Sequence, residues 1–97
     1  MAVYMIVDLR YEQLEWARGY RRNVPAMIAR WGGRYLAQSF PPERIEGEGE
    51  LPDSVTILEF PSAEAAHGLM QSEEYAPYAE ARRAQSRGFI YLVEERT

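Results

Sequence analysis

The chain has 97 residues, 46% of them hydrophobic and 27% charged, a composition typical of one globular domain rather than of a disordered segment. Its net charge of -4 argues against a nucleic-acid-binding protein, because a phosphate backbone requires a clustered basic face. Glu80 interrupts even the small basic group of Arg82, Arg83 and Arg87. We therefore expect a single domain over residues 1–97 with no nucleic-acid partner.

Several absences narrow the chemistry further. No apolar run approaches the roughly 18 residues of a membrane span, and no basic segment with a cleavage site opens the chain, so we expect a cytoplasmic protein without a membrane partner. The chain has no cysteine, and all eleven basic residues are arginine. Thiolate nucleophiles, cysteine-based metal sites and Schiff-base lysines are thereby excluded. We expect neither a metal ion nor a cofactor.

The first third of the chain predicts a strand followed by a helix. Apolar residues alternate with other residues over 2–10, as in a strand. Between Trp16 and Trp31 apolar residues recur three or four positions apart, as on one face of a helix. Because Pro25 lies inside this stripe, we expect a kink or two abutting helices near Asn23. Two glycines then end the helix.

The rest of the chain predicts strands around a second helical segment. The strands are predicted at 34–40, 54–60 and 89–93. Residues 43–53 form a loop rich in glutamate and glycine, which we interpret as a flap or a solvated turn. Ser62 is placed to cap a helix, and Ser72 to cap a further turn that continues to about Gln85. Gly88 should break this helix before the last strand.

The resulting order is βαββαβ, which is the split βαβ, ferredoxin-like motif. We therefore expect an α+β fold with a four-stranded antiparallel sheet and all helices on one face. One layer of helices covers only one face of such a sheet. Yet Phe89, Tyr91 and Val93 alternate with Ile90 and Leu92, so this strand is apolar on both faces. We expect a homodimer to cover the second face.

Several short segments together resemble one protein family. They are Asp8, Val24-Pro25-Ala26, Gly32-Gly33-Arg34-Tyr35-Leu36, Glu46-Gly47, Leu58-Glu59-Phe60-Pro61-Ser62 with Ala65-Ala66, Ser72-Glu73-Glu74-Tyr75 and Leu92-Val93-Glu94. In order and spacing they resemble the DUF1330 family, a domain of unknown function in the dimeric α+β barrel superfamily. The resemblance implies a ferredoxin-like fold and face-to-face pairing of two sheets, and no particular activity. The chain departs from the family pattern at Gln38-Ser39-Phe40, usually Arg-Gly-Gly, and at Leu51, usually an aromatic residue.

Charged residues on the predicted strands are the first candidates for a site. Asp8, Arg34 and Glu59 must be paired or must line a cavity if both faces of the sheet are covered. Beside Tyr4 and Tyr91, these residues could bind a small acidic or phenolic ligand and move a proton. In that case Asp8, Arg34 and Glu59 are the catalytic candidates. The alternative is that Asp8 and Arg34 form a structural ion pair at the sheet end.

Tyr20 and His67 complete the predicted ligand-binding set. His67 is the only histidine and lies beside Ala66 on the second helix. It is either a haem ligand, since barrels related to the resembled family degrade haem, or a histidine on the helix surface or edge. Five aromatic residues are interpreted mainly as core, although their polar tips could point into a pocket. These are Trp16, Tyr20, Trp31, Tyr75 and Tyr78.

Two functions from different classes remain open. The first, which rests on analogy with the superfamily, is a cofactor-independent enzyme, monooxygenase- or isomerase-like, acting on a small organic molecule. The second is a non-enzymatic homodimer that binds a small metabolite or serves as an accessory module. An enzyme requires a closed, partly apolar pocket with a titratable group inside it, which distinguishes the two.

Overall fold

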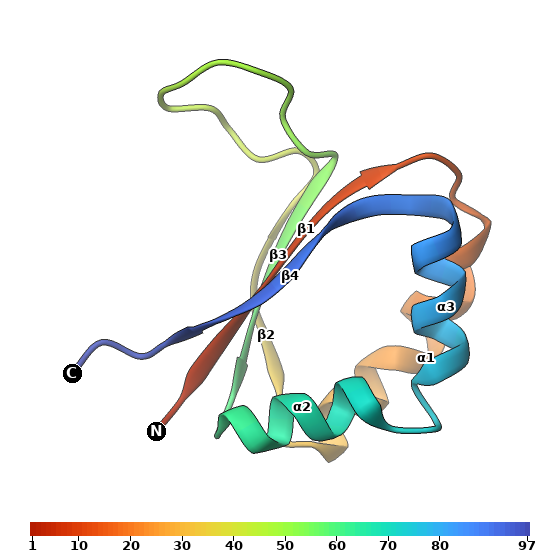
Figure 1. The fold of residues 1–97 in the computed structure, drawn as a ribbon, viewed down its shortest axis with the longest axis vertical. Coiled ribbons are helices and arrows are strands. Elements are labelled where there is room, and N and C mark those ends of the chain that lie inside the picture. Colours follow the sequence, from red (N-terminus) through yellow and green to blue (C-terminus); the bar gives the residue numbers. More distant parts are fainter.

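Four strands and three helices form the fold in a computed structural model that describes all 97 residues. The elements are β1 (Val3–Tyr11), α1 (Glu15–Arg30), β2 (Arg34–Ser39), β3 (Ser54–Phe60), α2 (Ala63–Gln71), α3 (Ala76–Gln85) and β4 (Ser86–Glu94). The strands pair antiparallel in the order β2-β3-β1-β4. All three helices lie on one side of this sheet (Figure 1). The predicted α+β, ferredoxin-like fold is confirmed.

The first helix is one continuous element, so of the two predicted alternatives near Asn23, a kink or two abutting helices, the second is wrong. Pro25 lies inside α1 and removes one backbone donor. Its neighbours Val24, Met27 and Ile28 are all buried against the sheet. This burial stabilises the helix through tertiary packing, which outweighs the loss of a single backbone hydrogen bond.

The last strand begins earlier than predicted, at Ser86 rather than Phe89. Gly88 does not break α3 but pairs opposite Leu9 inside the sheet. A Cβ atom at Gly88 would lie 1.9 Å from the backbone oxygen of Asp8. The glycine therefore permits a close approach of β4 to β1, a role that a sequence pattern cannot distinguish from a helix stop.

The two predicted serine caps are present. The Ser62 hydroxyl accepts a hydrogen bond from the Ala65 backbone N–H at 3.1 Å, which begins α2. The Ser72 hydroxyl accepts one from the Tyr75 N–H at 3.3 Å and donates one to the Leu69 carbonyl at 2.8 Å. Together these bonds define the corner between α2 and α3.

Strand alternation divides the sheet into an inner face, which meets the helices, and an outer face. Val3, Met5, Leu58 and Phe60 point inward and form the core with residues of the helices. The outer face has no covering layer within the chain, and Phe89 on it is 68% exposed. The stretch between β2 and β3 forms a loop with no regular structure that extends beyond the end of the sheet (Figure 1).

Candidate functional site

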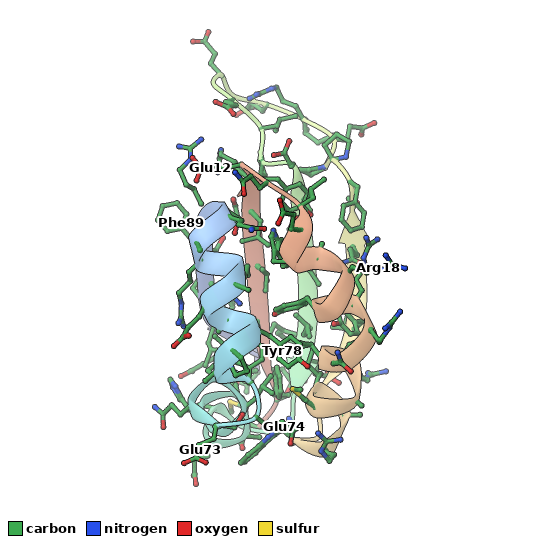
Figure 2. All side chains as sticks on the ribbon, turned by 90° about the vertical axis from the view of Figure 1, so that its right-hand side faces the viewer. Glu12, Arg18, Glu73, Glu74, Tyr78 and Phe89 are labelled. Atoms are coloured by element: carbon green, nitrogen blue, oxygen red, sulfur yellow. The ribbon has the colours of Figure 1, made fainter.

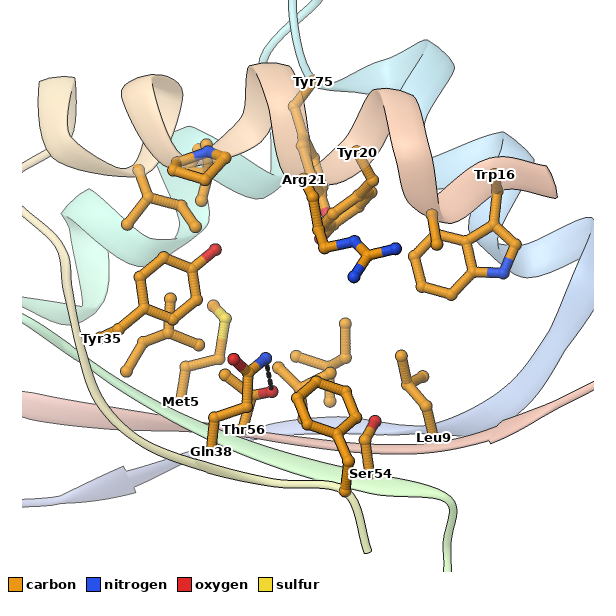
Figure 3. A pocket seen from close by; sticks show the side chains of 18 of the residues that line it. Met5, Leu9, Trp16, Tyr20, Arg21, Tyr35, Gln38, Ser54, Thr56 and Tyr75 are labelled. Carbon is orange, nitrogen blue, oxygen red and sulfur yellow. Dashed lines mark hydrogen bonds between the residues drawn. The ribbon is translucent and has the colours of Figure 1, made fainter. Parts of the chain in front are cut away.

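A cavity of about 540 Å³ lies between the inner face of the sheet and the helices (Figure 3). Sixteen of its 21 lining residues are hydrophobic, so it favours an apolar ligand. Inward residues of β1, β2 and β3 form its floor, and α1 contributes much of the opposite wall. The volume is in the range of ligand pockets for small organic molecules, about 300–1,000 Å³.

A chain of three polar side chains reaches this cavity from the helical layer. Tyr20 of α1 and Tyr75, just before α3, have their hydroxyl oxygens 2.6 Å apart. Arg82 of α3 donates from Nη1 to the Tyr75 hydroxyl at 2.5 Å and more weakly to the Tyr20 hydroxyl at 3.4 Å. Both tyrosines line the cavity, whereas Arg82 lies behind them.

The hydrogen-bond chain of Tyr20, Tyr75 and Arg82 has one hydroxyl proton to donate to a ligand. Arginine only donates, so the Tyr75 oxygen accepts from Arg82. The two hydroxyl groups have two protons, and one of them occupies the bond between Tyr20 and Tyr75. The other hydroxyl proton therefore remains free for a ligand, and the guanidinium polarises the chain toward donation.

Burial keeps the Tyr20 hydroxyl protonated. Desolvation, together with the charge and hydrogen bond of Tyr75, raises the pKa of Tyr20 far above its ordinary value of 10.0, and Arg82 opposes this only in part. Burial, with a smaller contribution from Tyr75, also raises the pKa of Tyr35. Phenols with raised pKa values act as hydrogen-bond donors, not bases, at neutral pH.

Aromatic packing holds Tyr20 in place. Trp16, one helical turn before it on α1, meets the Tyr20 ring edge-on at a centroid distance of 5.3 Å. The rings of Tyr20 and Tyr75 also pack edge-to-face, at 6.0 Å. On α3 the spacing from Tyr75 through Ala79 to Arg82 places all three on the buried side.

The opposite side of the cavity carries neutral polar groups. The Gln38 side-chain amide donates to the Thr56 hydroxyl at 2.9 Å, as Figure 3 shows. Nearby, the Tyr11 hydroxyl donates to that of Ser54 at 2.7 Å. The only charged side chain in the lining is that of Arg21. No carboxylate or imidazole lines the cavity, so its polar groups can hold an anionic oxygen but include no ordinary general base.

The charged strand residues of the sequence prediction lie on the other face of the sheet. Arg34 and Glu59 are paired across β2 and β3, with Nε and Oε1 2.8 Å apart, and Arg34 is largely exposed. Asp8 pairs instead with Arg10 on its own strand, at 3.1 Å. The structure thus brings Arg34 and Glu59 together but places neither of them, nor Asp8, in the cavity.

The predicted ligand-binding residues are divided between the two faces. Tyr4 and Tyr91 are on the outer face, because the inward positions of β1 and β4 are those of Met5 and Ile90. His67 is exposed on α2 and does not line the cavity. Tyr20 alone of this set lines it.

Several residues of the site were missed from the sequence. Trp16 and Tyr75 were interpreted mainly as core, and Arg82 only as part of an interrupted basic group. A signal for Arg82 was present, since it follows Tyr75 and Ala79 on the apolar stripe of a helix, where an unpaired arginine is costly. Gln38 stood out only as a departure from the family pattern and Thr56 not at all, because their pairing depends on the register of β2 with β3.

The chain has neither a metal-binding cluster nor a membrane-spanning helix. No group of three or more histidine, cysteine, aspartate or glutamate side chains is arranged to hold a metal ion. None of the three helices has the length and apolar character needed to cross a bilayer.

Comparisons with known proteins agree with the fold. The chain is 19% identical to RPA0582, a protein of unknown function from Rhodopseudomonas palustris, with a TM-score of 0.85 over 99% of this chain and 83% of that one. It is likewise 19% identical to SnoaB, a cofactor-independent oxygenase from Streptomyces nogalater, with a TM-score of 0.68 over 99% and 94% of the two chains. At this identity the similarity shows a shared fold alone.

The sequence itself gives the family. No curated protein matches the chain. The model of one family, described as a domain of unknown function, matches residues 2–96, nearly the full length. The match agrees with the resemblance found in the short motifs, and the chain belongs to the DUF1330 family.

Proposed function

We propose that this protein is a cofactor-independent enzyme that binds a small, flat organic molecule and stabilises its enolate or phenolate. The observation that supports this most directly is the Tyr20–Tyr75–Arg82 hydrogen-bond chain, which ends in a free hydroxyl proton at an apolar cavity. Donors preorganised toward a developing negative charge are worth more among apolar side chains than in bulk water.

The cavity suits an aromatic ligand. Apolar side chains cover most of the wall, and the ring of Trp16 offers an edge or face for stacking. Polar contacts are available at two ends, from the tyrosine pair and from Gln38 with Thr56. A planar molecule with a hydroxyl or carbonyl oxygen directed at the Tyr20–Tyr75 pair would satisfy both requirements.

The chemistry follows from stabilising the anion. A substrate with an acidic C–H beside a carbonyl group loses a proton to solvent, and the hydroxyl chain lowers its pKa by donating to the enolate oxygen. Reprotonation at another carbon gives an isomerase-like outcome. Addition of the carbanion to molecular oxygen and loss of water converts a CH₂ group into a carbonyl, so that CH₂ and O₂ give C=O and H₂O. No external reductant is needed.

The comparisons favour the oxygenase over the isomerase. SnoaB, which has the same fold, is described as a cofactor-independent oxygenase. That description belongs to SnoaB, and its extension to this chain is part of our proposal. The cavity residues of the present chain are compatible with it, because they hold an anion without supplying a redox group.

The second candidate function is a non-enzymatic small-metabolite-binding module. It is favoured by the absence of a carboxylate or imidazole from the lining, since an efficient proton-abstracting enzyme usually holds a base near the reacting atom. The two candidates share the cavity and differ in whether a bound molecule is activated.

Hydrogen exchange separates the two. We would incubate the purified protein in D₂O with 2-tetralone, an enolisable aromatic ketone, and follow α-proton exchange by NMR and oxygen uptake by electrode. The proposal predicts faster exchange than in buffer and a loss of at least about tenfold in Tyr20→Phe, the effect of removing one oxyanion donor. Tyr78→Phe is the control, because the Tyr78 hydroxyl has no hydrogen bond and does not line the cavity. Tight binding without any acceleration would establish the binding module instead.

We also propose that the protein is a homodimer that pairs through its outer sheet face. Phe89, Tyr91 and Val93 form an exposed apolar row along β4, and Ile6 and Ile57 continue it across β1 and β3. A second copy is the simplest complementary cover, because a twofold interface matches the same patch with itself. In this arrangement Arg34, Glu59 and Asp8 lie at or beside the interface, and we assign them to pairing rather than to catalysis.

A further inference from the structure

A second cavity, of about 490 Å³, lies where α3 meets β4. Eight residues line it, and three of them are arginines: Arg82, Arg83 and Arg87. No acidic residue is in the lining. Of the three arginines only Arg87 has an acidic partner, Glu12, which lies outside the lining, so the concave site carries an excess of positive charge that attracts anions.

Arg82 is the decisive residue of this cavity. It is only 5% exposed, and among the ion pairs of the chain none involves it. A buried charge without a counter-charge costs several kcal/mol. The hydroxyls of Tyr20 and Tyr75 compensate in part, but they are neutral and both are reached from the same nitrogen, Nη1.

The other edge of the guanidinium is open. Neither Nε nor Nη2 of Arg82 donates a hydrogen bond to any group of the chain. No fully buried side-chain nitrogen lacks a partner, so both of these nitrogens retain contact with open space. The cavity that Arg82 lines is where such a pair of parallel N–H groups could meet a planar or tetrahedral oxyanion in bidentate fashion.

The remaining contacts leave this edge free. The Ser86 hydroxyl donates to the Arg82 carbonyl at 2.6 Å and so fixes the backbone. Arg87 has one acidic neighbour, Glu12, at 3.7 Å, in a pair whose members are both more than half exposed. Such a pair is weak and can yield to a bound anion.

A simpler explanation is that the arginines compensate the negative end of the α3 dipole, since Arg82 and Arg83 lie in its last turn. That interaction requires only a side chain near the helix terminus, which exposed Arg83 satisfies. It does not explain why Arg82 is buried, nor why it turns one edge to the tyrosines and leaves the other open.

We propose that the cavity at the α3–β4 junction is a binding site for the oxyanion of a small molecule, a carboxylate or a phosphate. Arg82 would bind it through Nε and Nη2, and Arg83 and Arg87 would neutralise the remaining charge from the rim. This site shares Arg82 with the hydroxyl chain of the first cavity but uses the opposite edge of its guanidinium, and its existence does not depend on the proposed reaction.

Binding is measured on the full chain by ¹⁵N NMR, with sodium phosphate and sodium benzoate titrated separately at constant ionic strength against sodium chloride. We expect saturable shifts of the Ser86, Arg87 and Gly88 amide signals with at least one of the two anions. A response to phosphate alone identifies a phosphorylated ligand, and a response to benzoate alone identifies a carboxylate. Shifts no larger than those in chloride would overturn the proposal.

Variants test the assignment of the residues. Arg87→Met should weaken anion binding by about threefold to fivefold, because it removes one exposed positive charge from the rim. Arg18→Met is the matched control, because Arg18 is exposed on α1 and lines neither cavity (Figure 2), and it should leave the affinity unchanged. Arg82→Lys retains the charge at the buried position but loses the bidentate edge, and it should also weaken binding about tenfold. Equal affinities in Arg87→Met and Arg18→Met would contradict the assignment.

Discussion

The two faces of the sheet use the same strands for different chemistry. On β1, Met5 and Leu9 face the helices and line the cavity, whereas Tyr4 and Asp8 face away. The inner face carries hydroxyls and amides between apolar walls. The outer face carries ion pairs, such as that of Arg34 with Glu59, within an apolar surface.

Under our proposals, this difference separates ligand recognition on the inner face from dimer assembly on the outer face. Ionised carboxylates occur where water or a second chain can meet them, which limits the cost of desolvation. The cavity instead contains Tyr20, a phenol that burial keeps protonated, with the buried Arg82 behind it. Reactivity in the cavity would therefore come from donors that stabilise a substrate anion, while the charges on the strands serve the outer surface.

Both faces depend on the pairing of β4 with β1, so disrupting it should have the largest effect. In Gly88→Ala the new methyl group would meet the Asp8 carbonyl oxygen at 1.9 Å and force the strands apart. We expect a loss of roughly 3 kcal/mol or more in the free energy of unfolding, measured by urea denaturation.

The matched control for this variant is Gly19→Ala in α1, where the nearest side-chain atom to the new methyl group is 3.9 Å away. Helix propensity should make Gly19→Ala more stable than the wild type by about 0.5–1 kcal/mol. A Gly88→Ala protein as stable as Gly19→Ala would contradict the close approach of the two strands.

The second prediction concerns a variant that disrupts the proposed dimer contact on the outer face and leaves the inner face unchanged. Phe89→Glu places a charge in the centre of the exposed apolar row, which a second copy could cover only at the cost of burying that charge. Light scattering after size exclusion should show the mass of one chain, against two for the wild type. Ile45→Glu, in the loop and 87% exposed, is the control and should stay dimeric. A wild-type monomer would disprove the homodimer.

The third prediction uses alkaline pH to probe the inner face. The raised pKa of Tyr20 means that the folded chain retains a proton that the unfolded chain loses near pH 10. The resulting stability is fully present below pH 10 and is lost as the pH rises further. The free energy of unfolding should fall by up to about 1.4 kcal/mol per pH unit from this group alone. Between pH 10 and 11.5 the free energy of unfolding of Tyr20→Phe should fall less steeply with pH than that of the wild type. Identical slopes for the two proteins would show that Tyr20 is not desolvated.

The smallest effect is expected on the outer face at Arg34. Arg34→Met removes an ion pair whose arginine is 69% exposed, and such pairs contribute about 0–1 kcal/mol. The midpoint temperature of thermal unfolding should fall by only a few degrees. The affinity of the cavity for an aromatic ligand should not change. A tenfold loss of ligand affinity would instead connect Arg34 to the site and restore the catalytic role first expected for it.

The sequence predicted the fold well because its signals are local. Alternation gave the strands to within a few residues, and serine caps marked the start of α2 and the corner before α3. Gly88 was misjudged because a glycine that ends a helix and one that admits a neighbouring strand have the same local context.

The site was predicted poorly because it depends on which face each strand turns to the helices. The sequence shows that Tyr4 and Asp8 share a face, but not that this is the face without helices. Charge drew attention to Asp8, Arg34 and Glu59, whereas the cavity is built mainly from neutral groups. The Tyr20–Tyr75 bond joins side chains 55 positions apart, which no spacing pattern reveals.

The ionisation of 2-naphthol bound in the cavity tests the central claim most directly. An apolar cavity alone would raise the pKa of a bound phenol through desolvation, whereas an effective donor chain would lower it. We predict that the pKa of bound 2-naphthol, followed by absorbance, lies at least about one unit below its value in water, and that Tyr20→Phe removes most of this shift. A bound pKa above that of free 2-naphthol would show that the cavity binds neutral molecules and does not stabilise their anions.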